Sequence, residues 1–141
     1  MFKNLKQKQV TIFVCQFPLS SGKIIEKNKA IETFDATNID TSQVTSMQDL
    51  FCLCNKIQTL DVSGWDISKV KYFILAFDLM TSLKTLKGVE SWDTQSATDM
   101  QSIFFMNSNL SVNLSGWNVS KVTQHSTFNY YANKVIVPKR P

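Results

Sequence analysis

Trp65-Asp66-Ile67-Ser68-Lys69-Val70 is the stretch that decides the fold of this chain, because variants of it recur at a nearly constant spacing. The other copies are Ile39-Asp40-Thr41-Ser42-Gln43-Val44, Trp92-Asp93-Thr94-Gln95-Ser96-Ala97 and Trp117-Asn118-Val119-Ser120-Lys121-Val122. Their first positions, 39, 65, 92 and 117, are 26, 27 and 25 residues apart. Such a period is typical of a solenoid, in which each repeat forms one coil and only the stack of coils buries a core.

The apolar positions after each phrase also repeat, as expected if they stack in columns. Three places after the phrase, the units carry Met47, Phe73, Met100 and His125. An aromatic residue follows four places later, and one place early in the last unit, as Phe51, Phe77, Phe104 and Phe128. Leu60 and Leu86 share a further position, for which the third unit offers Val112 or Leu114. We therefore expect three inward columns: Trp65, Trp92 and Trp117; Val44, Val70, Ala97 and Val122; and Phe51, Phe77 and Phe104.

Local patterns predict the secondary structure of each unit. Leu60-Asp61-Val62 and Val112-Asn113-Leu114 alternate between apolar and polar residues, as short parallel strands do. Residues 44–51 have apolar side chains at a spacing closer to that of a helical or 3-10 turn. The Asp and Ser of each phrase can hydrogen-bond to the backbone two residues on and fix a tight corner.

Residues 44–51, followed by Cys54, Ile57 and Leu60-Asp61-Val62, resemble a known repeat. The pattern Val-Thr-x-Met-x-x-Leu-Phe after the Trp-Asp-x-Ser phrase is similar to that of BspA-type leucine-rich-repeat surface proteins. The closest version has a period of roughly 25 residues and is common in mycoplasma-type lipoproteins. The resemblance covers residues 39 to about 137. It implies an extracellular or cell-surface binding module with no catalytic activity and no cofactor.

The period and the resemblance together predict an α/β repeat fold. We expect a leucine-rich-repeat-like solenoid of about four coils of 25–27 residues over residues 39–137, with short parallel strands and short helical or 3-10 turns. Residues 1–38 are expected to form an N-terminal segment and a cap, in which residues 30–34 cover the first coil, because the open end of a solenoid needs a cap. Residues 138–141 form a basic tail.

Residues 1–22 have the order of a weak signal peptide, namely basic, then apolar, then small residues. Gln16 and Pro18 interrupt the apolar part, so a strand over residues 10–17 is the alternative. Residues 1–38 hold six Lys against three acids, and residues 39–137 hold seven Lys against eight acids. Because the basic excess lies outside the repeats, the charge argues against a nucleic-acid partner. No apolar run reaches the 18 residues of a transmembrane helix.

Metal and nucleophile chemistry finds little support in the sequence. Cys52 and Cys54 form a lone Cys-x-Cys pair with no second pair, and Cys54 shares a column with Met80 and Asn107, which favours a buried core residue. His125 is the only histidine and falls in the last unit, where a half-exposed structural role is favoured. The acidic column of the phrases offers one carboxylate per coil, whereas calcium needs six to eight converging oxygens. We predict no catalytic residue and no metal site.

Two functions follow from these observations. The first is a surface or secreted interaction module, adhesin-like, that binds a protein or glycan on a host or neighbouring cell. The alternative is a structural spacer, or a fragment of a longer repeat array with no ligand of its own. Because inward positions are committed to the columns, the partner-binding face is expected on outward positions beside the strands. These positions are Gln58, Thr59, Asp61, Lys84, Thr85, Lys87, Ser111 and Asn113.

Overall fold

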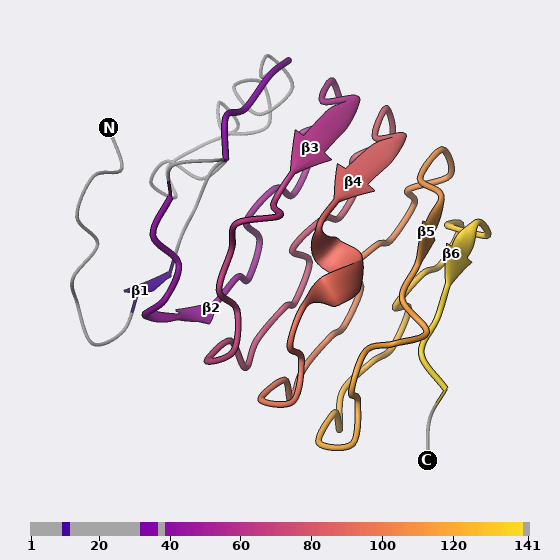
Figure 1. Cartoon of the computed structure of the whole chain (residues 1–141). Helices are drawn as coiled ribbons and strands as arrows, with labels where there is room; N and C mark the ends of the chain where they lie inside the picture. The colour runs from indigo at the N-terminus through magenta and orange to yellow at the C-terminus, as the bar shows by residue number, and fades with distance from the viewer. Residues whose placement is uncertain (1–9, 12–31, 37–38, 140–141) are drawn as a thin grey trace, which may run out of the picture.

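Very short parallel strands joined by long turns make up this molecule. The computed structural model describes residues 10–11, 32–36 and 39–139. Its strands, and the one 3-10 helix among these residues, are β1 (Val10–Thr11), β2 (Val44–Ser46), β3 (Thr59–Asp61), β4 (Thr85–Lys87), η1 (Val89–Ser91), β5 (Val112–Asn113) and β6 (Val135–Ile136). Figure 1 shows the elements in this order from one end of the molecule to the other.

This architecture corrects the expected fold class. The described residues contain no α-helix, and their strands are two or three residues long. The strands pair as three separate two-stranded parallel sheets, β1–β2, β3–β4 and β5–β6, and not as one continuous sheet. The prediction of an α/β leucine-rich-repeat-like solenoid is therefore wrong for this chain, whose described residues form mainly turns and irregular segments. Between β4 and β5 the units differ in length, because Gly88 and η1 follow β4 and have no counterpart after β3 or β5.

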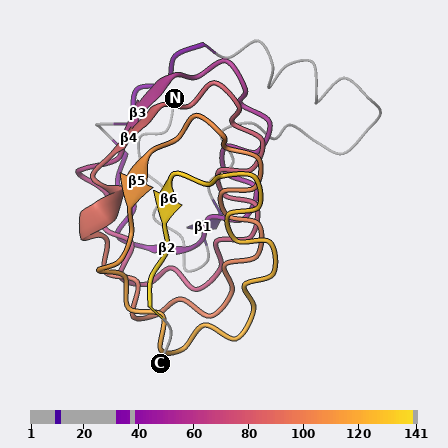
Figure 2. The same ribbon diagram turned by 90° about the vertical axis from the view of Figure 1, so that its right-hand side faces the viewer.

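Successive sequence units nevertheless lie side by side (Figure 1). Isolated parallel bridges join Ser46 to Tyr72, Tyr72 to Asp99, and Asp99 to Gln124. Figure 2, seen from the end that carries β6, shows the units overlapping around a shared interior. Equivalent residues of neighbouring units therefore contact each other, so contacts that are far apart in sequence hold this chain together.

The expected columns of aromatic side chains are confirmed. The rings of Trp65 and Trp92 lie 6.4 Å apart, those of Trp92 and Trp117 lie 6.1 Å apart, and both pairs stack nearly parallel. The ring of Phe77 stacks on those of Phe51 and Phe104 at 5.7 Å and 5.5 Å. All six side chains are buried. Stacked rings bury a large apolar area, so these columns supply much of the hydrophobic stabilisation.

The column of smaller apolar residues is confirmed for three of its members. Val44, Val70 and Ala97 are buried, whereas Val122 is half-buried in the last unit. The open assignment in the third unit is also resolved. The amides of Trp65 and Trp117 donate to the carbonyls of Val62 and Leu114, respectively, so Leu114 corresponds to Val62. Val112 therefore takes the position shared by Leu60 and Leu86.

Residues 44–51 do not form the expected helical or 3-10 turn. The amide of Leu50 does donate to the carbonyl of Met47, three residues back, but Asp49 adopts a φ of 58° and ends the turn. Each unit has two residues with positive φ, four positions apart: Asp49 and Leu53, Leu75 and Leu79, Ser102 and Met106, and Thr127 and Tyr131. A left-handed residue costs roughly 1–2 kcal/mol, so the interactions between units must compensate for these turns.

A ladder of backbone hydrogen bonds between units compensates for the left-handed residues, and all its donors face the same way. Amides at residues 47, 49, 51 and 53 donate to carbonyls at 72, 74, 76 and 78 over 2.8–2.9 Å. The same pattern repeats from residues 73–79 to 99–105 and from 100–106 to 124–130, with distances of 2.7–3.0 Å. In this segment each unit directs its alternate amides toward the following unit and its alternate carbonyls toward the preceding one. We call it the amide ladder.

The predicted corners of the Trp-Asp-x-Ser phrases are confirmed. The Oδ1 atom of Asp66 accepts hydrogen bonds from the backbone amide and the hydroxyl of Ser68, at 3.0 Å and 2.7 Å. Asp40 binds Ser42 in the same way, and the side chains of Asp93 and Asn118 accept from the amides two residues on. These side chains satisfy backbone donors at turns, as their sequence spacing predicted.

The first unit is covered in part by the N-terminal segment. The ring of Phe34 lies edge-on to that of Phe51 at 5.3 Å, and the carbonyl of Ala36 accepts a hydrogen bond from Nε1 of Trp65. Strand β1 pairs with β2, which fits the alternative of a strand within residues 10–17. The rest of the possible signal peptide, residues 1–22, lies outside the described residues, as do residues 30 and 31. Among the described residues, no helix has the length and apolar character needed to cross a bilayer.

Candidate functional site

The β3–β4 pair brings together six of the eight residues predicted to form a binding face. Thr59 is paired with Thr85, and Asp61 with Lys87, on either side of the buried pair Leu60 and Leu86. Gln58 and Lys84 directly precede the two strands and are exposed. Because neighbouring side chains of a strand point to opposite faces, burial of the two leucines directs the flanking residues outward. We call this surface the β3–β4 face.

The β3–β4 face carries two lysines and one carboxylate, so its net charge is positive. The Oδ1 atom of Asp61 accepts hydrogen bonds from the hydroxyl and the amide of Ser63, at 2.6 Å and 3.1 Å. These two bonds, together with the nearby Lys87 ammonium, hold the pKa of Asp61 below its usual value. The Asp61 carboxylate thus stabilises the turn that follows β3. Nζ of Lys84 lies 3.4 Å from Oε1 of Gln58, and both side chains remain exposed.

Asn113 belongs to a different sheet, and Ser111 directly precedes the strand β5 of that sheet. Both are exposed, but β5 pairs with β6 and has no strand pairing with β4. The Oδ1 atom of Asn113 accepts a hydrogen bond from the amide of Ser115, so this side chain also closes its own turn. The structure therefore supports a face on β3 and β4 and leaves these two residues beside it, on the neighbouring unit.

A hollow beside the β3–β4 face was missed by the sequence analysis. A cavity of about 560 Å³ is lined by Glu32, Thr33, Lys56, Gln58, Thr59 and Ser82. Nζ of Lys56 lies 3.4 Å from a carboxylate oxygen of Glu32, but both side chains are mostly exposed, so the pair contributes little stability. Lys56 and Ser82 each precede a core residue of the repeat, Ile57 or Leu83, which is the one signal that places them together.

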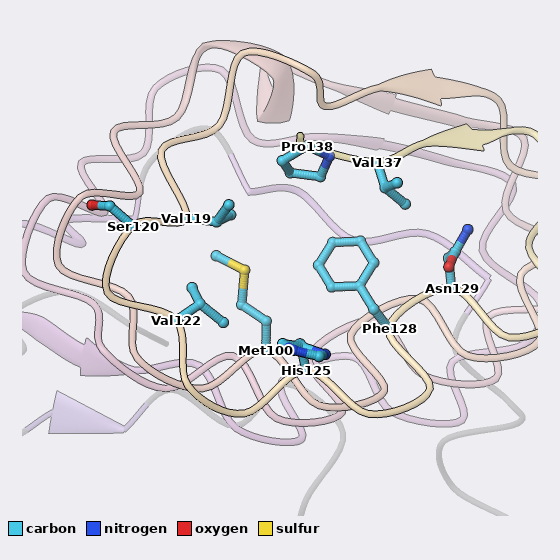
Figure 3. Close-up of a pocket in the computed structure, with 9 residues that line it drawn as sticks. All are labelled: Met100, Val119, Ser120, Val122, His125, Phe128, Asn129, Val137 and Pro138. Carbon is cyan, nitrogen blue, oxygen red and sulfur yellow. The ribbon is translucent and has the colours of Figure 1, made fainter. Parts of the chain in front are cut away.

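A second cavity, of about 260 Å³, lies in the last unit. Figure 3 shows Met100, Val119, Val122 and Phe128 around one space, with Val137 and Pro138 across from Met100. His125, predicted to be half-exposed, is so and lines this cavity together with Ser120 and Asn129. We call it the terminal cavity. The sequence analysis placed His125 in the last unit and did not predict a cavity there.

One titratable pair lies between the first two units. Sγ of Cys52 donates to Oδ2 of Asp78 over 3.5 Å, and Oδ1 of Asp78 is buried with no hydrogen-bond partner among the described residues. Burial raises the pKa of Asp78 to about 6, and a further contribution comes from Asp49. Burial, with Asp78 beside it, raises the pKa of the Cys52 thiol to about 12. A thiol with this pKa stays protonated at neutral pH and is a poor nucleophile.

Two further predictions concern Cys54 and the presence of a metal site. Cys54 is fully buried, which confirms the prediction of a buried core residue, and the equivalent residues Met80 and Asn107 are fully buried as well. Among residues 32–36 and 39–139, no three His, Cys, Asp or Glu side chains gather into a possible metal site.

Comparison with known proteins gives one match. The sequence model of the family described as "Mycoplasma protein of unknown function, DUF285" matches residues 21–137. The chain belongs to the DUF285 family. The matched part of this DUF285 protein contains all four phrases, the β3–β4 face and nearly all of the terminal cavity. Neither the curated proteins nor the solved structures give a match to it.

Proposed function

We propose that this DUF285 protein is a non-catalytic interaction module, adhesin-like, located on a cell surface or secreted, which binds a protein or glycan through the β3–β4 face. The observation that carries the proposal is that Thr59, Thr85, Lys84 and Lys87 are exposed together beside a hollow of about 560 Å³. The resemblance of its repeat to BspA-type surface proteins supports the location.

The chemistry of the β3–β4 face suits a protein or glycan. Hydroxyl, amide and ammonium groups alternate there, and the only carboxylate of the paired strands is held by Ser63. Hydroxyl and amide groups can both donate and accept hydrogen bonds, as recognition of sugars or peptide groups requires. Two lysines alone are a small footprint for a nucleic-acid backbone, whose binding depends on many phosphate contacts.

A binding experiment tests the proposal directly. The full chain is screened on a glycan array and against extracts of exposed host-cell proteins, in parallel with a Lys84→Glu/Lys87→Glu variant. We expect a specific partner to bind the unmodified chain and to be lost with the variant, at an unchanged melting temperature. A Lys69→Glu/Lys71→Glu variant is the matched control, since it changes the net charge equally at exposed lysines outside β3 and β4.

The alternative function is a structural spacer without a ligand of its own. It rests on the stacking of units through equivalent contacts. A chain that binds nothing in these screens, or loses binding equally in both lysine variants, would favour the spacer over the β3–β4 face.

A further inference from the structure

The amide ladder has one side toward the core and another toward solvent. Its segments in the first three units are residues 47–54, 73–80 and 100–107, and each directs four fully buried side chains into the core. Nearly all the other side chains of these segments are half-buried or exposed. The large apolar ones among them are Leu53, Ile74, Leu75, Leu79, Phe105 and Met106. We call this outer surface, which lies on a different side of the molecule from β3 and β4 (Figure 2), the ladder face.

The apolar residues of the ladder face occupy backbone positions where smaller residues would be less strained. Leu53, Leu75, Leu79 and Met106 have φ between 54° and 65°, a region that glycine or asparagine adopts more easily. None of these four side chains belongs to the core or to the half-buried side chains that pack against it. Strain of this kind is typical of functional positions, and a cluster of outward apolar side chains is typical of an interaction surface. The ladder face therefore has the character of a surface that a partner covers.

The charge of the ladder face is negative. Its three segments contain Asp49 and Asp78 and no Lys, Arg, His or Glu. Asp78 is 5% exposed, and its Oδ1 atom has no hydrogen-bond partner among the described residues. The ion pair found among these residues, between Lys56 and Glu32, involves neither carboxylate. A buried charge is screened only weakly by salt, so ionised Asp78 makes the potential at this face negative although the whole chain has a net charge of +4.

Apolar side chains and uncompensated carboxylates together select one kind of partner. A polypeptide that carries Lys or Arg beside its apolar side chains complements both features. A membrane surface complements only one of them, because anionic lipids would be repelled by Asp49 and Asp78. Two copies of this chain that met through their ladder faces would bring carboxylates against carboxylates. The occupant is therefore a basic amphipathic segment of another protein.

From these observations we propose that the ladder face binds a basic amphipathic helix. The apolar side of this helix covers Leu75, Leu79 and Met106, and its Lys or Arg side chains lie near Asp49 and Asp78. Recognition of a helix by its apolar side is a common mode of peptide binding, and flanking charges then set the choice of partner. This surface is separate from the β3–β4 face, so either proposal can fail without the other.

A synthetic peptide of about 14 residues, with Leu along one side of a helix and Lys along the other, is the probe. It is labelled with fluorescein and titrated with the full chain, and binding is followed by fluorescence anisotropy. One control peptide has Glu in place of every Lys, and a second has Ser in place of every Leu. We expect the Leu/Lys peptide to bind about tenfold more tightly than either control. General charge attraction cannot produce this order, because the net charge of the chain is +4.

Two substitutions on the ladder face separate binding from folding. Leu79→Asn removes an apolar side chain and introduces a residue that tolerates the φ of 54° at this position. Asp78→Asn removes a charge at nearly constant shape. Each should weaken binding of the Leu/Lys peptide about tenfold, while the melting temperature stays the same for Leu79→Asn and rises for Asp78→Asn. Residues that act only in folding would not lose binding in this way.

Asp61→Asn is the matched control for position. It changes the net charge by the same amount as Asp78→Asn, but Asp61 lies on the β3–β4 face. This variant should keep the affinity for the Leu/Lys peptide. Should Leu79→Asn fail to fold, Met106→Asn takes its place, because the Met106 side chain is 38% exposed and also has a positive φ.

The affinity should also depend on pH. Asp78 has a pKa of about 6 and becomes charged above it, whereas the Lys side chains of the peptide stay charged throughout. The titratable groups that face Asp78 are Asp49 and the Cys52 thiol, which stays protonated. Binding of the Leu/Lys peptide should therefore become severalfold tighter between pH 5 and pH 7.5, and Asp78→Asn should weaken this dependence.

Several results would overturn the inference. These are equal binding of the Leu/Lys and Leu/Glu peptides, unchanged affinity in Asp78→Asn or in the folded apolar variant, and equal losses in Asp78→Asn and Asp61→Asn. The lysine substitutions that test the β3–β4 face leave every residue of the ladder face in place, so their outcome does not decide this one.

Discussion

Among the three tryptophans of the aromatic column, Trp92 differs in the hydrogen bonding of its indole N–H. The indole Nε1 of Trp65 donates to Ala36 at 2.9 Å, and that of Trp117 donates to Val89 at 2.8 Å. Nε1 of Trp92 is buried and has no partner among the described residues. In the preceding unit the carbonyl equivalent to that of Val89 belongs to Val62, and among the described residues it accepts a hydrogen bond only from the amide of Trp65. The extra residue Gly88 lies in the segment that leads to Trp92, which accounts for the changed geometry.

Replacing each indole by a phenyl ring should reveal this difference. Trp65→Phe and Trp92→Phe remove the same atoms from equally buried sites, but only Trp65→Phe leaves a buried carbonyl unpaired. We expect Trp65→Phe to cost about 1–3 kcal/mol more than Trp92→Phe. Urea denaturation of the two variants measures it. Equal costs would mean that Nε1 of Trp92 has a partner in solution.

The buried carboxyl of Asp78 should make stability depend on pH. Its pKa is about 6 in the folded chain and 3.8 in a free side chain, so the folded state binds this proton more tightly. Stability is therefore unaffected below pH 4, decreases as the pH rises from about 4 to about 6, and stays lower above that. Asp78→Asn should remove this decrease and raise the free energy of unfolding at pH 7.5 by on the order of 2 kcal/mol.

Parallel urea titrations of both proteins between pH 4 and pH 8 check the effect. The difference between them should grow with pH and level off above pH 7. A constant difference would show that the carboxyl does not titrate in this range. Asp61→Asn is the control with the opposite sign. Ser63 lowers the pKa of Asp61, so this substitution should decrease the free energy of unfolding at neutral pH.

Residues at this scale were only partly predictable from the sequence. The Asp–Ser corners and the inward Trp and Phe positions follow directly from repeated residue types. Positive φ at residues such as Leu53, Leu75 and Met106 does not, because side chains of this kind rarely adopt it and no local signal marks them. Asp78 was also missed, since its position holds Cys52, Phe105 and Tyr130 in other units and shows no shared class.

Among the elements, the phenylalanine column should be strongest at its centre. The ring of Phe77 is fully buried and stacks on a ring in each neighbouring unit. The ring of Phe128 is only half-buried and meets Phe104 edge-on. Phe77→Ala should cost about 3–5 kcal/mol, and Phe128→Ala clearly less. Denaturant titration of both variants tests the ranking, and equal losses would contradict it.

The turn after β4 depends on one glycine. Gly88 has a φ of 87°, and a Cβ atom built there would lie 2.3 Å from the backbone Cα of Ser63. Gly88→Ala should therefore cost on the order of 3 kcal/mol, from the left-handed backbone and the clash together. Gly64→Ala is the control, since a Cβ there meets nothing within 4 Å. Thermal unfolding compares them, and similar melting temperatures would show that the turn can relax.

Strand positions were predicted more accurately than their pairing. Leu60-Asp61-Val62 and Val112-Asn113-Leu114 overlap β3 and β5 closely, because alternation marks a half-buried strand. The break between β4 and β5 could not be derived in the same way. It follows from unit lengths of 27 and 25 residues, whose effect on hydrogen bonding depends on the path of the turn at Gly88.

For the whole molecule, hydrogen exchange should decrease from the last unit toward the centre. The amides of Phe73, Leu75, Phe77 and Leu79 are bonded to the next unit and lie between neighbours on both sides. Those of Thr127, Asn129 and Tyr131 have no such acceptor among the described residues. We expect the first group to exchange at rates set by global unfolding and the second within minutes. Exchange followed by NMR measures both, and equal protection would show that the last unit is covered in solution.

The sequence gives the number of charged residues correctly, but it does not show where they lie on the folded molecule. The sequence places the basic excess outside residues 39–137, and Lys121 and Lys134 fall inside that range. Only the stacking order shows that these two lysines, together with Lys139, belong to one end of the molecule that has no acidic residue. The terminal cavity was likewise beyond sequence reasoning, because the residues that line it, such as Met100, Val119 and Val137, share no repeated pattern.

All amides of the amide ladder face the following unit, so the length of the protein can change by whole units. Each boundary joins the same donors to the same acceptors, so removing residues 66–92 would connect Trp65 to Asp93 and bring the amides of 47–53 onto carbonyls already shaped to receive them. Duplicating those residues would do the reverse. Whole periods can therefore be added or removed while the ladder still joins amides to carbonyls, whereas removal of half a period would shift its register. Tandem duplication of a whole period is thus the simplest sequence change by which such a protein becomes longer.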